Sequence, residues 1–175
     1  TPSSPPLLYP PSHALEALSW LQTFHAEQGP DFADPAPGWT IVSERTGITV
    51  RKKMIPRISE VLPVYRGDKI VQGLSADSIL SLVSASGCRS TWDERIELAT
   101  PLTSYGYGVK TDLLATKPVF PFKGRLFHVA SVNATVRVPS ASATSSTSSI
   151  YFSASASFPP DETFDQKRIN PTGLL

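Results

Sequence analysis

Cysteine is almost absent from the sequence, which has only Cys88 among its 175 residues. A single cysteine excludes an internal disulfide and a cysteine-based zinc site, and it fits a reducing compartment. An excess of one charge is also lacking, because 16 Lys and Arg stand against 15 Asp and Glu. Such a balance provides no long-range field to recruit nucleic acid or an anionic membrane, and leaves only local basic patches for such contacts. We therefore predict a cytoplasmic protein that does not bind nucleic acid.

Long apolar runs and catalytic motifs are missing as well. No run approaches the roughly 18 apolar residues of a membrane-spanning helix, and the first residues lack the basic and apolar regions of a signal peptide. The three histidines, His13, His25 and His128, are too scattered for a metal set. No Ser/His/Asp set or carboxylate pair forms a recognisable motif. These absences predict a protein that is not an enzyme and needs no metal or cofactor.

Proline is plentiful, and it suggests the domain organisation. Five of the 17 prolines fall within residues 1–11, where they deny helix and sheet their hydrogen-bond donors. We expect these residues to form an extended or disordered lead-in. The remaining residues, 12–175, fit one domain with enough length for a sizeable core and a cavity.

The pattern of apolar residues predicts a helix, strands, a second short helix and then long strands. Ser12 is a plausible N-cap for an amphipathic helix that ends near Gly29, and Ser75 is a plausible cap for the short helix. Strands are predicted over residues 39–44, 48–54 and 64–72, and long strands from residue 105 onward.

The last two long strands alternate clearly between apolar and mixed positions. In the first, the even residues of 126–136 are mainly apolar, and in the second the even residues of 150–158 are apolar while serines recur between them. We expect the two strands to pair across the intervening serine-rich loop. The order of elements shows no βαβ alternation and no repeat, so it predicts an α+β fold whose curved antiparallel sheet holds something on its inner face.

The segment Arg89-Ser90-Thr91-Trp92-Asp93 directly follows the short helix. An R-x-x-W-D in this place resembles the START family of lipid-transfer domains. Further stretches agree in the same order, namely Trp39, LPVYRGDKIVQGLSADSILSLV before the motif, and PFKGR at 121–125. The resemblance covers about residues 39–158. It implies a helix-grip fold, in which a bent sheet wraps a hydrophobic tunnel closed by a C-terminal lid helix, and a sterol, phospholipid, ceramide or fatty-acyl ligand.

The chain departs from the family in two places. START domains commonly have Arg-Asp where this sequence has Arg125-Leu126, so the hydrogen bond of that Asp is missing or replaced. The sequence also ends at Leu175, before the family's last strands and lid helix can be fitted. We therefore expect a domain that is incomplete at its C-terminus, with the remainder lying outside this sequence or supplied by a second copy or another chain. Exposed cavity lining would favour such a partner.

Four residues mark the resemblance structurally: Arg89, Trp92, Asp93 and Arg125. We expect Trp92 to be a core residue whose indole N–H finds an acceptor. Asp93 is expected to pair with Arg89 or Arg95, because a lone buried carboxylate is costly. This segment is therefore interpreted as a marker of the fold, without a catalytic role.

Asp112 is the main polar candidate for a ligand site. Counting back without gaps from Arg125 places it where the sterol-binding relatives carry a cavity carboxylate, although their partner arginine is Ser131 here. Strand parity puts Asp112 on one face with Lys110 and Leu114, whereas Tyr105, Tyr107, Val109 and Leu113 take the other. If the aromatic face lines the tunnel, Asp112 points to solvent. If Asp112 lies inside, it orients a ligand hydroxyl through a charge-assisted hydrogen bond, while apolar walls dominate affinity at about 0.8 kcal/mol per buried methylene.

The leading hypothesis is a lipid-binding or lipid-transfer module that makes and breaks no bond. The alternative is a lipid-sensing regulatory or scaffold domain of a larger protein; a small hydrolase or cyclase has no motif to support it. Transient membrane contact is conceivable through Arg51-Lys52-Lys53, although a solvated strand end is the more common role. Parity allows only some of the predicted ligand-binding residues to face inward, and these residues are Val109, Asp112, Leu113, Leu114, Phe120, Phe122, Phe127, Val129 and Phe152.

Overall fold

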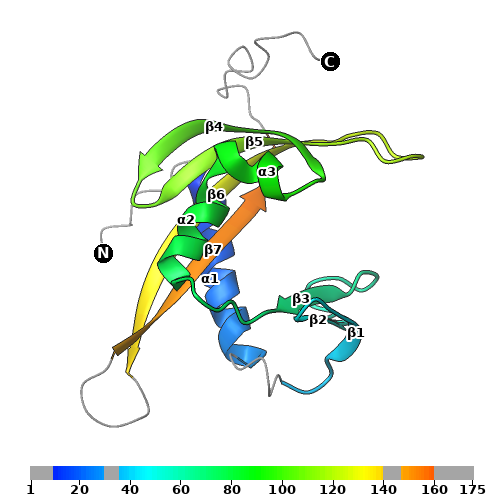
Figure 1. Ribbon diagram of the computed structural model, residues 1–175, viewed down its shortest axis with the longest axis vertical. Helices are drawn as coiled ribbons and strands as arrows, with labels where there is room; N and C mark the ends of the chain where they lie inside the picture. The colour runs from blue at the N-terminus through cyan, green and yellow to red at the C-terminus, as the bar shows by residue number, and fades with distance from the viewer. Residues whose placement is uncertain (1–9, 30–35, 140–146, 160–175) are drawn as a thin grey trace, which may run out of the picture. The chain divides into compact units, whose positions relative to one another are not determined.

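The computed structural model describes residues 10–29, 36–139 and 147–159 and has an α+β fold (Figure 1). Its contacts define two compact units, one formed by the described parts of residues 1–21 and 76–175, the other by those of residues 22–75. Most of the predicted lead-in, the greater part of the serine-rich loop and the whole C-terminal segment lie outside the described residues.

The first helix, α1, spans Pro11–Glu27, close to the prediction. It begins one residue before the expected cap, because proline fits the first helical position, where its missing N–H needs no partner. The backbone N–H of His13 donates to the Pro10 carbonyl over 3.1 Å. Ala14 is fully buried and the part-buried Leu18 and Leu21 continue the same stripe. The predicted amphipathic face is therefore present.

The unit of residues 22–75 contains a three-stranded antiparallel sheet in the order β1-β2-β3. Its third strand ends at Asp68 instead of Gln72, because Asp68 pairs with Thr49 and only Ile48 of β2 remains beyond that pair before the β1–β2 turn. The carboxylate of Asp68 forms ion pairs with Arg51 and Arg66, with N···O distances of 2.8 and 2.7 Å. The strands are β1 (Thr40–Arg45), β2 (Ile48–Lys53) and β3 (Val64–Asp68).

The other unit contains a four-stranded antiparallel sheet in the order β4-β5-β6-β7. Three helical segments precede it, namely α2 (Ala76–Ser84), the 3₁₀ turn η1 (Ser86–Cys88) and the single-turn α3 (Arg89–Trp92). The strands are β4 (Ile96–Gly106), β5 (Val109–Thr116), β6 (Leu126–Pro139) and β7 (Thr147–Ser157). The predicted pairing of the last two strands is confirmed, with Val132 opposite Ala154 and Ala134 opposite Phe152.

The strand β4 starts at Ile96, nine residues earlier than predicted. Its register shifts between Ile96 and Leu98, again between Pro101 and Thr103, and a third time near Gly106. Each shift breaks the alternation by which a strand is identified in a sequence. Pro101 is tolerated because β4 is an edge strand.

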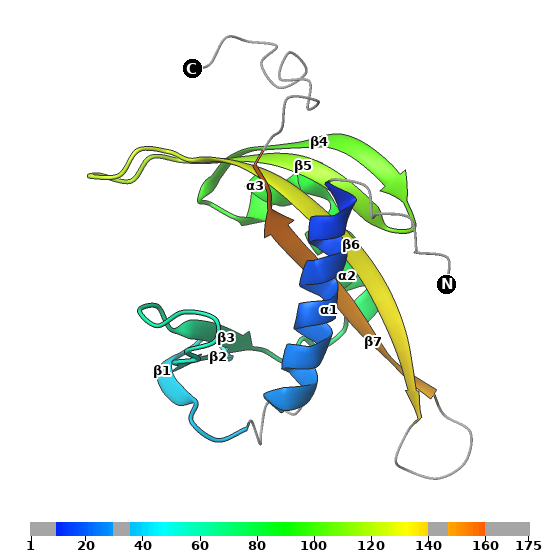
Figure 2. The same ribbon diagram turned by 180° about the vertical axis from the view of Figure 1, so that it is seen from behind.

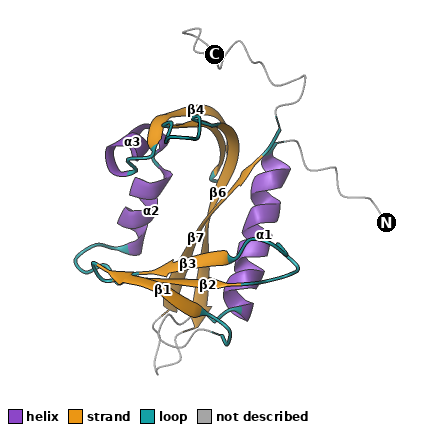
Figure 3. Ribbon diagram, turned by 90° about the vertical axis from the view of Figure 1, so that its right-hand side faces the viewer, coloured by secondary structure: helices purple, strands orange, loops and turns teal. Residues whose placement is uncertain are grey.

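The two faces of the four-stranded sheet differ in what covers them. On one face, Val109, Val132 and Ala154 pack with Ala14 of α1 in the main hydrophobic cluster. Helix α2 lies on the opposite side of the sheet from α1 (Figure 3). The view from behind shows α1 running across β6 and β7 (Figure 2). The apolar alternation of β6 and β7 therefore serves the packing of α1.

The R-x-x-W-D segment forms α3 and its exit. Asp93 is buried and pairs with Arg95 at 3.3 Å and with Arg89 at 3.8 Å, so the predicted ion pairs are confirmed. The predicted burial of Trp92 is wrong, since its side chain is 42% exposed. The short helix brings the Arg89 guanidinium to 5.5 Å from the Trp92 ring, a cation–π distance. Trp92 thus packs on its own helix.

Candidate functional site

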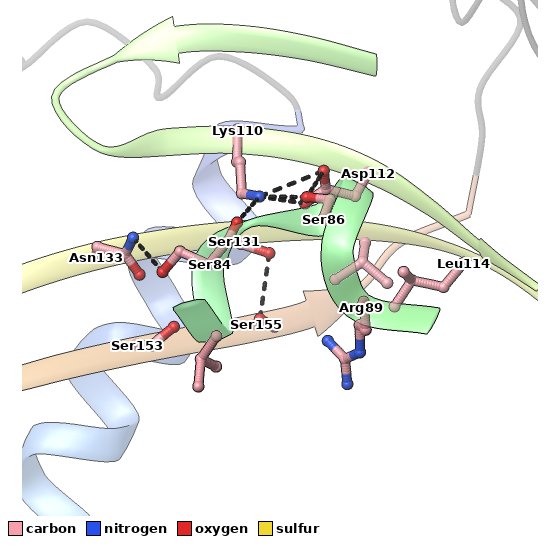
Figure 4. A pocket seen from close by; sticks show the side chains of 12 residues that line it. Ser84, Ser86, Arg89, Lys110, Asp112, Leu114, Ser131, Asn133, Ser153 and Ser155 are labelled. Atoms are coloured by element: carbon pink, nitrogen blue, oxygen red, sulfur yellow. Dashed lines mark hydrogen bonds and ion pairs between the residues drawn. The ribbon is translucent and has the colours of Figure 1, made fainter. Parts of the chain in front are cut away.

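A small polar pocket lies on the face of the four-stranded sheet that is turned away from α1 (Figure 4). Its floor comes from β5, β6 and β7, and its cover from the end of α2, from η1 and from α3. The cavity has a volume of about 50 Å³. Its lining residues are Val83, Ser84, Ser86, Arg89, Lys110, Asp112, Leu114, Val129, Ser131, Asn133, Ser153 and Ser155.

An ion pair on strand β5 lies inside the pocket and is linked to η1 through Ser86. Asp112 is only 4% exposed, and its carboxylate accepts a hydrogen bond of 2.5 Å from the Ser86 hydroxyl. The Lys110 ammonium lies 3.2 Å from the same carboxylate. It also donates to the Ser84 carbonyl over 2.5 Å and to the Ser86 oxygen. A buried carboxylate is tolerated here because an opposite charge and a hydroxyl satisfy it.

Hydroxyl and amide groups cover the floor next to this pair. Ser155 donates to Ser131 over 3.2 Å, and the Asn133 amide donates to Ser84 over 2.8 Å. Ser131 and Asn133 are two residues apart on one strand, as are Ser153 and Ser155 on the next. Alternate residues share a face, so the four side chains point to the same side. The three serine side chains are small, so they leave space above the sheet.

The apolar part of the pocket is formed by Val83, Leu114 and Val129. Leu114 pairs in register with Phe127, which is half-buried on the same face. The pocket thus has a charged and hydroxyl-rich portion on one side and aliphatic side chains on the other, an arrangement that suits an amphiphile.

The predicted ligand-binding residues fall into three groups in the structure. Asp112, Leu114 and Val129 line the pocket together, and Phe127 lies beside them in register. Val109, Leu113 and Phe152 are buried at positions of the opposite parity, on the face that packs with α1. Phe120 and Phe122 are exposed in the segment between β5 and β6. A ligand-binding role for any of them stays a prediction.

Sequence reasoning missed several residues of the pocket. Ser86 and the serines of β6 and β7 resemble ordinary solvent-facing positions, because serine alternating with apolar residues is typical of any half-exposed strand. Lys110 carried a usable signal, since it lies two residues from Asp112 and so must share its face. Arg89 was assigned to the fold alone, yet it also lines the pocket.

The chemistry of the charge pair fits binding better than covalent catalysis. Ser86 contacts Lys110, and a catalytic serine would contact its general base in the same way. A lysine that acts as a general base must be a neutral amine. Lys110 instead contacts the carboxylate of Asp112 as an ammonium donor. The pair can therefore offer one donor and one acceptor to a bound molecule without transferring a proton.

Within residues 10–29, 36–139 and 147–159, no group of three or more His, Cys, Asp or Glu side chains is arranged to hold a metal ion. In the same ranges, no helix has both the length and the apolar character needed to cross a membrane.

Comparisons with known proteins identify the fold. No protein-family model matches the chain, and no curated protein matches it. A crystal structure of a STAR-related lipid transfer protein from Xanthomonas axonopodis is similar, with a TM-score of 0.51 and 16% sequence identity. The similarity covers 71% of this chain and 75% of that one. At this identity the match establishes the fold alone, so the chain has a START-like α+β fold of the helix-grip type.

Proposed function

We propose that this chain is a lipid-binding module that carries or transfers an amphiphilic lipid without covalent chemistry. One observation carries the proposal: the pocket on the sheet face away from α1 combines an ion pair, whose carboxylate is buried, with aliphatic walls. The similarity to a lipid transfer protein supports it, because the pocket lies on the sheet of a shared fold.

In this proposal the polar end of the lipid meets Asp112, Lys110 and Ser86. The apolar part runs along Val129 and Leu114 toward Phe127 on the same strand face. Each buried methylene contributes about 0.8 kcal/mol, so the chains provide most of the affinity and the charge pair orients the head. A sterol hydroxyl, a phospholipid headgroup and a fatty-acyl carboxylate can each make such contacts.

Loading requires the pocket to enlarge. A cavity of about 50 Å³ is small beside the roughly 300 to 1,000 Å³ of small-molecule sites. The α2–η1 segment covers the pocket through side-chain hydrogen bonds of Ser84 and Ser86 to strand residues. We propose that this segment moves away from the sheet when a lipid enters.

The test is lipid capture followed by lipid transfer. Native mass spectrometry of the gently purified protein should detect a bound lipid, and labelled lipid should move between vesicles. Val129→Trp, which fills the pocket, should slow transfer by about tenfold. The matched control Leu126→Trp lies on the same strand at an exposed position and should transfer normally.

Three outcomes decide between the candidates. A protein that is always empty and takes up no lipid refutes the proposal. A protein that binds lipid without moving it between vesicles is a sensing domain. Equal transfer rates for Val129→Trp and Leu126→Trp refute the proposal that this pocket holds the lipid, but not the proposal that the protein binds lipid.

A further inference from the structure

Strand β7 forms an edge of the four-stranded sheet that lacks the usual protection against pairing with another strand. Within the described ranges, β7 pairs with β6 on one side and with no strand on the other. All eleven of its residues are uncharged, and the sequence has no Asp, Glu, Lys or Arg between Arg137 and Asp161. Its register with β6 has no shift along its whole length. A long, regular and uncharged edge is a template for a further strand.

The other edges of the described strands are interrupted, charged or short. Strand β4, at the opposite edge of the same sheet, has three register shifts and Pro101. The part of β6 that extends beyond β5 contains Arg137 and Pro139. In the three-stranded sheet, β1 has a register shift and β3 has five residues. Bulges, prolines, charges and short length each oppose edge pairing, so β7 is the one regular open edge among the described strands.

The backbone groups of β7 alternate between its two sides. The Phe158 N–H donates to the His128 carbonyl over 3.0 Å, at the end of the unshifted ladder of β6 and β7. In an antiparallel ladder, alternate residues direct both N–H and C=O to the same neighbouring strand. The even residues of β7 therefore bond to β6, and the odd residues direct their groups outward. These outward residues are Ser149, Tyr151, Ser153, Ser155 and Ser157.

The composition of β7 favours a second copy of the same strand over an unrelated peptide. A foreign peptide that adds to a sheet edge is selected by pockets for its alternate side chains, and a strand made mainly of serine and alanine offers few such pockets. A second β7 must join its odd residues to the odd residues of the first, because only these direct their backbone groups outward. Even residues then lie opposite even ones, so Phe152 and Ala154 meet apolar partners. No charge faces a like charge in this pairing.

We propose that two copies of this chain pair antiparallel through β7, which joins two four-stranded sheets into one sheet of eight strands. The two-fold axis stands perpendicular to the sheet, so both α1 helices lie on one side and both polar pockets on the other. One open edge per copy closes this assembly at two chains, because no regular edge is left for a third. Ser153 and Ser155 form the part of the pocket floor that belongs to β7, and the second β7 extends that floor beyond the edge.

Analytical ultracentrifugation of the whole chain gives the first test. At about 100 μM the protein should sediment with twice the 18.9 kDa of one chain, and it should dissociate toward about 1 μM, as a micromolar Kd predicts. Ser153→Pro removes one outward N–H from each copy and leaves the bonds to β6, so it should raise the dimer Kd at least about tenfold. The matched control Ser153→Ala removes the same hydroxyl, keeps the N–H and should dimerise like the unaltered protein.

Amide hydrogen exchange, resolved by residue with mass spectrometry, gives the second test and needs no substitution. The odd amides of β7 should exchange about fivefold more slowly at about 100 μM than at about 1 μM, because the second copy covers them. The even amides already bond to β6, so their exchange should change less with concentration. Circular dichroism should show that Ser153→Pro is folded; if that variant unfolds, exchange in the unaltered chain decides alone.

The outcomes separate the possible occupants of the edge. A chain that stays monomeric at about 100 μM overturns the proposal. A monomer whose odd amides are protected at every concentration overturns it in favour of a segment of the chain itself. A dimer that survives Ser153→Pro, or one in which odd and even amides of β7 slow equally, overturns the assignment to β7. Neither measurement involves a lipid, so failure here leaves the proposed lipid function untouched.

Discussion

The two faces of the four-stranded sheet are built from the same strands but serve different purposes. One face packs Val132, Ala154 and their neighbours against α1 in a hydrophobic cluster. The other carries the Lys110–Asp112 ion pair, whose carboxylate is buried, and small hydroxyl side chains that line a cavity. Apolar contacts stabilise the fold in proportion to the buried area and have no directional preference. Buried polar groups, in contrast, must each have a hydrogen-bond partner. The comparison indicates that folding stability resides mainly on the α1 face, whereas the pocket face supplies the polar groups of the proposed lipid site.

The largest expected effect comes from removing a core ring on the α1 face. Phe158 is buried in the cluster, with its ring 6.1 Å from that of His13. Phe158→Ala should lower the free energy of unfolding by about 3 kcal/mol, because it removes apolar contacts and leaves a cavity. Urea denaturation measures this change. Ser155→Ala, on the pocket face, should change it by less than about 1 kcal/mol. Equal losses of unfolding free energy for the two variants would show that the two faces of the sheet contribute equally to stability.

Breaking the charge pair should have the next largest effect. Asp112→Ala leaves the part-buried Lys110 ammonium without its carboxylate and Ser86 without its acceptor. We expect a loss of about 2 kcal/mol in the free energy of unfolding, discounted for the partial exposure of Lys110. The double variant Asp112→Ala, Lys110→Met should recover part of that loss, because it removes the stranded charge. No recovery in urea denaturation would mean that the two charges are not coupled.

The β4–β5 hairpin offers a smaller, paired test. Gly106 and Gly108 both have positive φ angles, 83° and 75°, which side chains rarely adopt. A Cβ at Gly108 would lie 2.8 Å from the Asn133 carbonyl oxygen, whereas one at Gly106 meets nothing within 4 Å. Gly106→Ala should therefore cost about 1 kcal/mol and Gly108→Ala about 2 kcal/mol in thermal unfolding. A larger cost at Gly106 would contradict the close approach of β5 and β6 beside the pocket.

The smallest effect concerns pH. Burial lowers the pKa of His128, which faces Phe158 on the α1 side, below its ordinary value of 6.5. The unfolded chain therefore binds a proton more readily than the folded one, so the contribution of His128 is complete above pH 6.5 and falls as the pH drops through that value. Unfolding midpoints measured between about pH 7.5 and about pH 5.5 should decline less for His128→Gln. An identical decline would assign the effect to other groups.

The sequence predicted the long regular strands well and the irregular ones poorly. Strands β6 and β7 were identified because uninterrupted alternation extends through most of their length. Strand β4 was located only in its last residues, since three register shifts and Pro101 erase its pattern. The prediction that Trp92 is buried was wrong because the residue lies in a single helical turn. Such a turn is too short to give a periodic pattern in the sequence.

The candidate site was predictable only where a charge stood out. Parity alone placed Lys110, Asp112 and Leu114 on one face, as the structure has them. It could not decide which face is covered by α1, because that depends on contacts between segments distant in sequence. Phe120 and Phe122 were assigned to the ligand by hydrophobicity, whereas their exposure in the structure depends on backbone hydrogen bonds that composition does not reveal.

The position of Ser86 between Lys110 and Asp112 has a consequence for selectivity. Its hydroxyl accepts from the ammonium and donates to the carboxylate. In the proposed lipid complex, a guest alcohol that takes its place would reproduce both bonds, so η1 would be released without stranding either charge. For such a guest, the exchange of one hydroxyl for another would be nearly neutral in energy at the charged end. Discrimination between guest alcohols would then depend on the shape of the apolar body that we place along Leu114 and Val129.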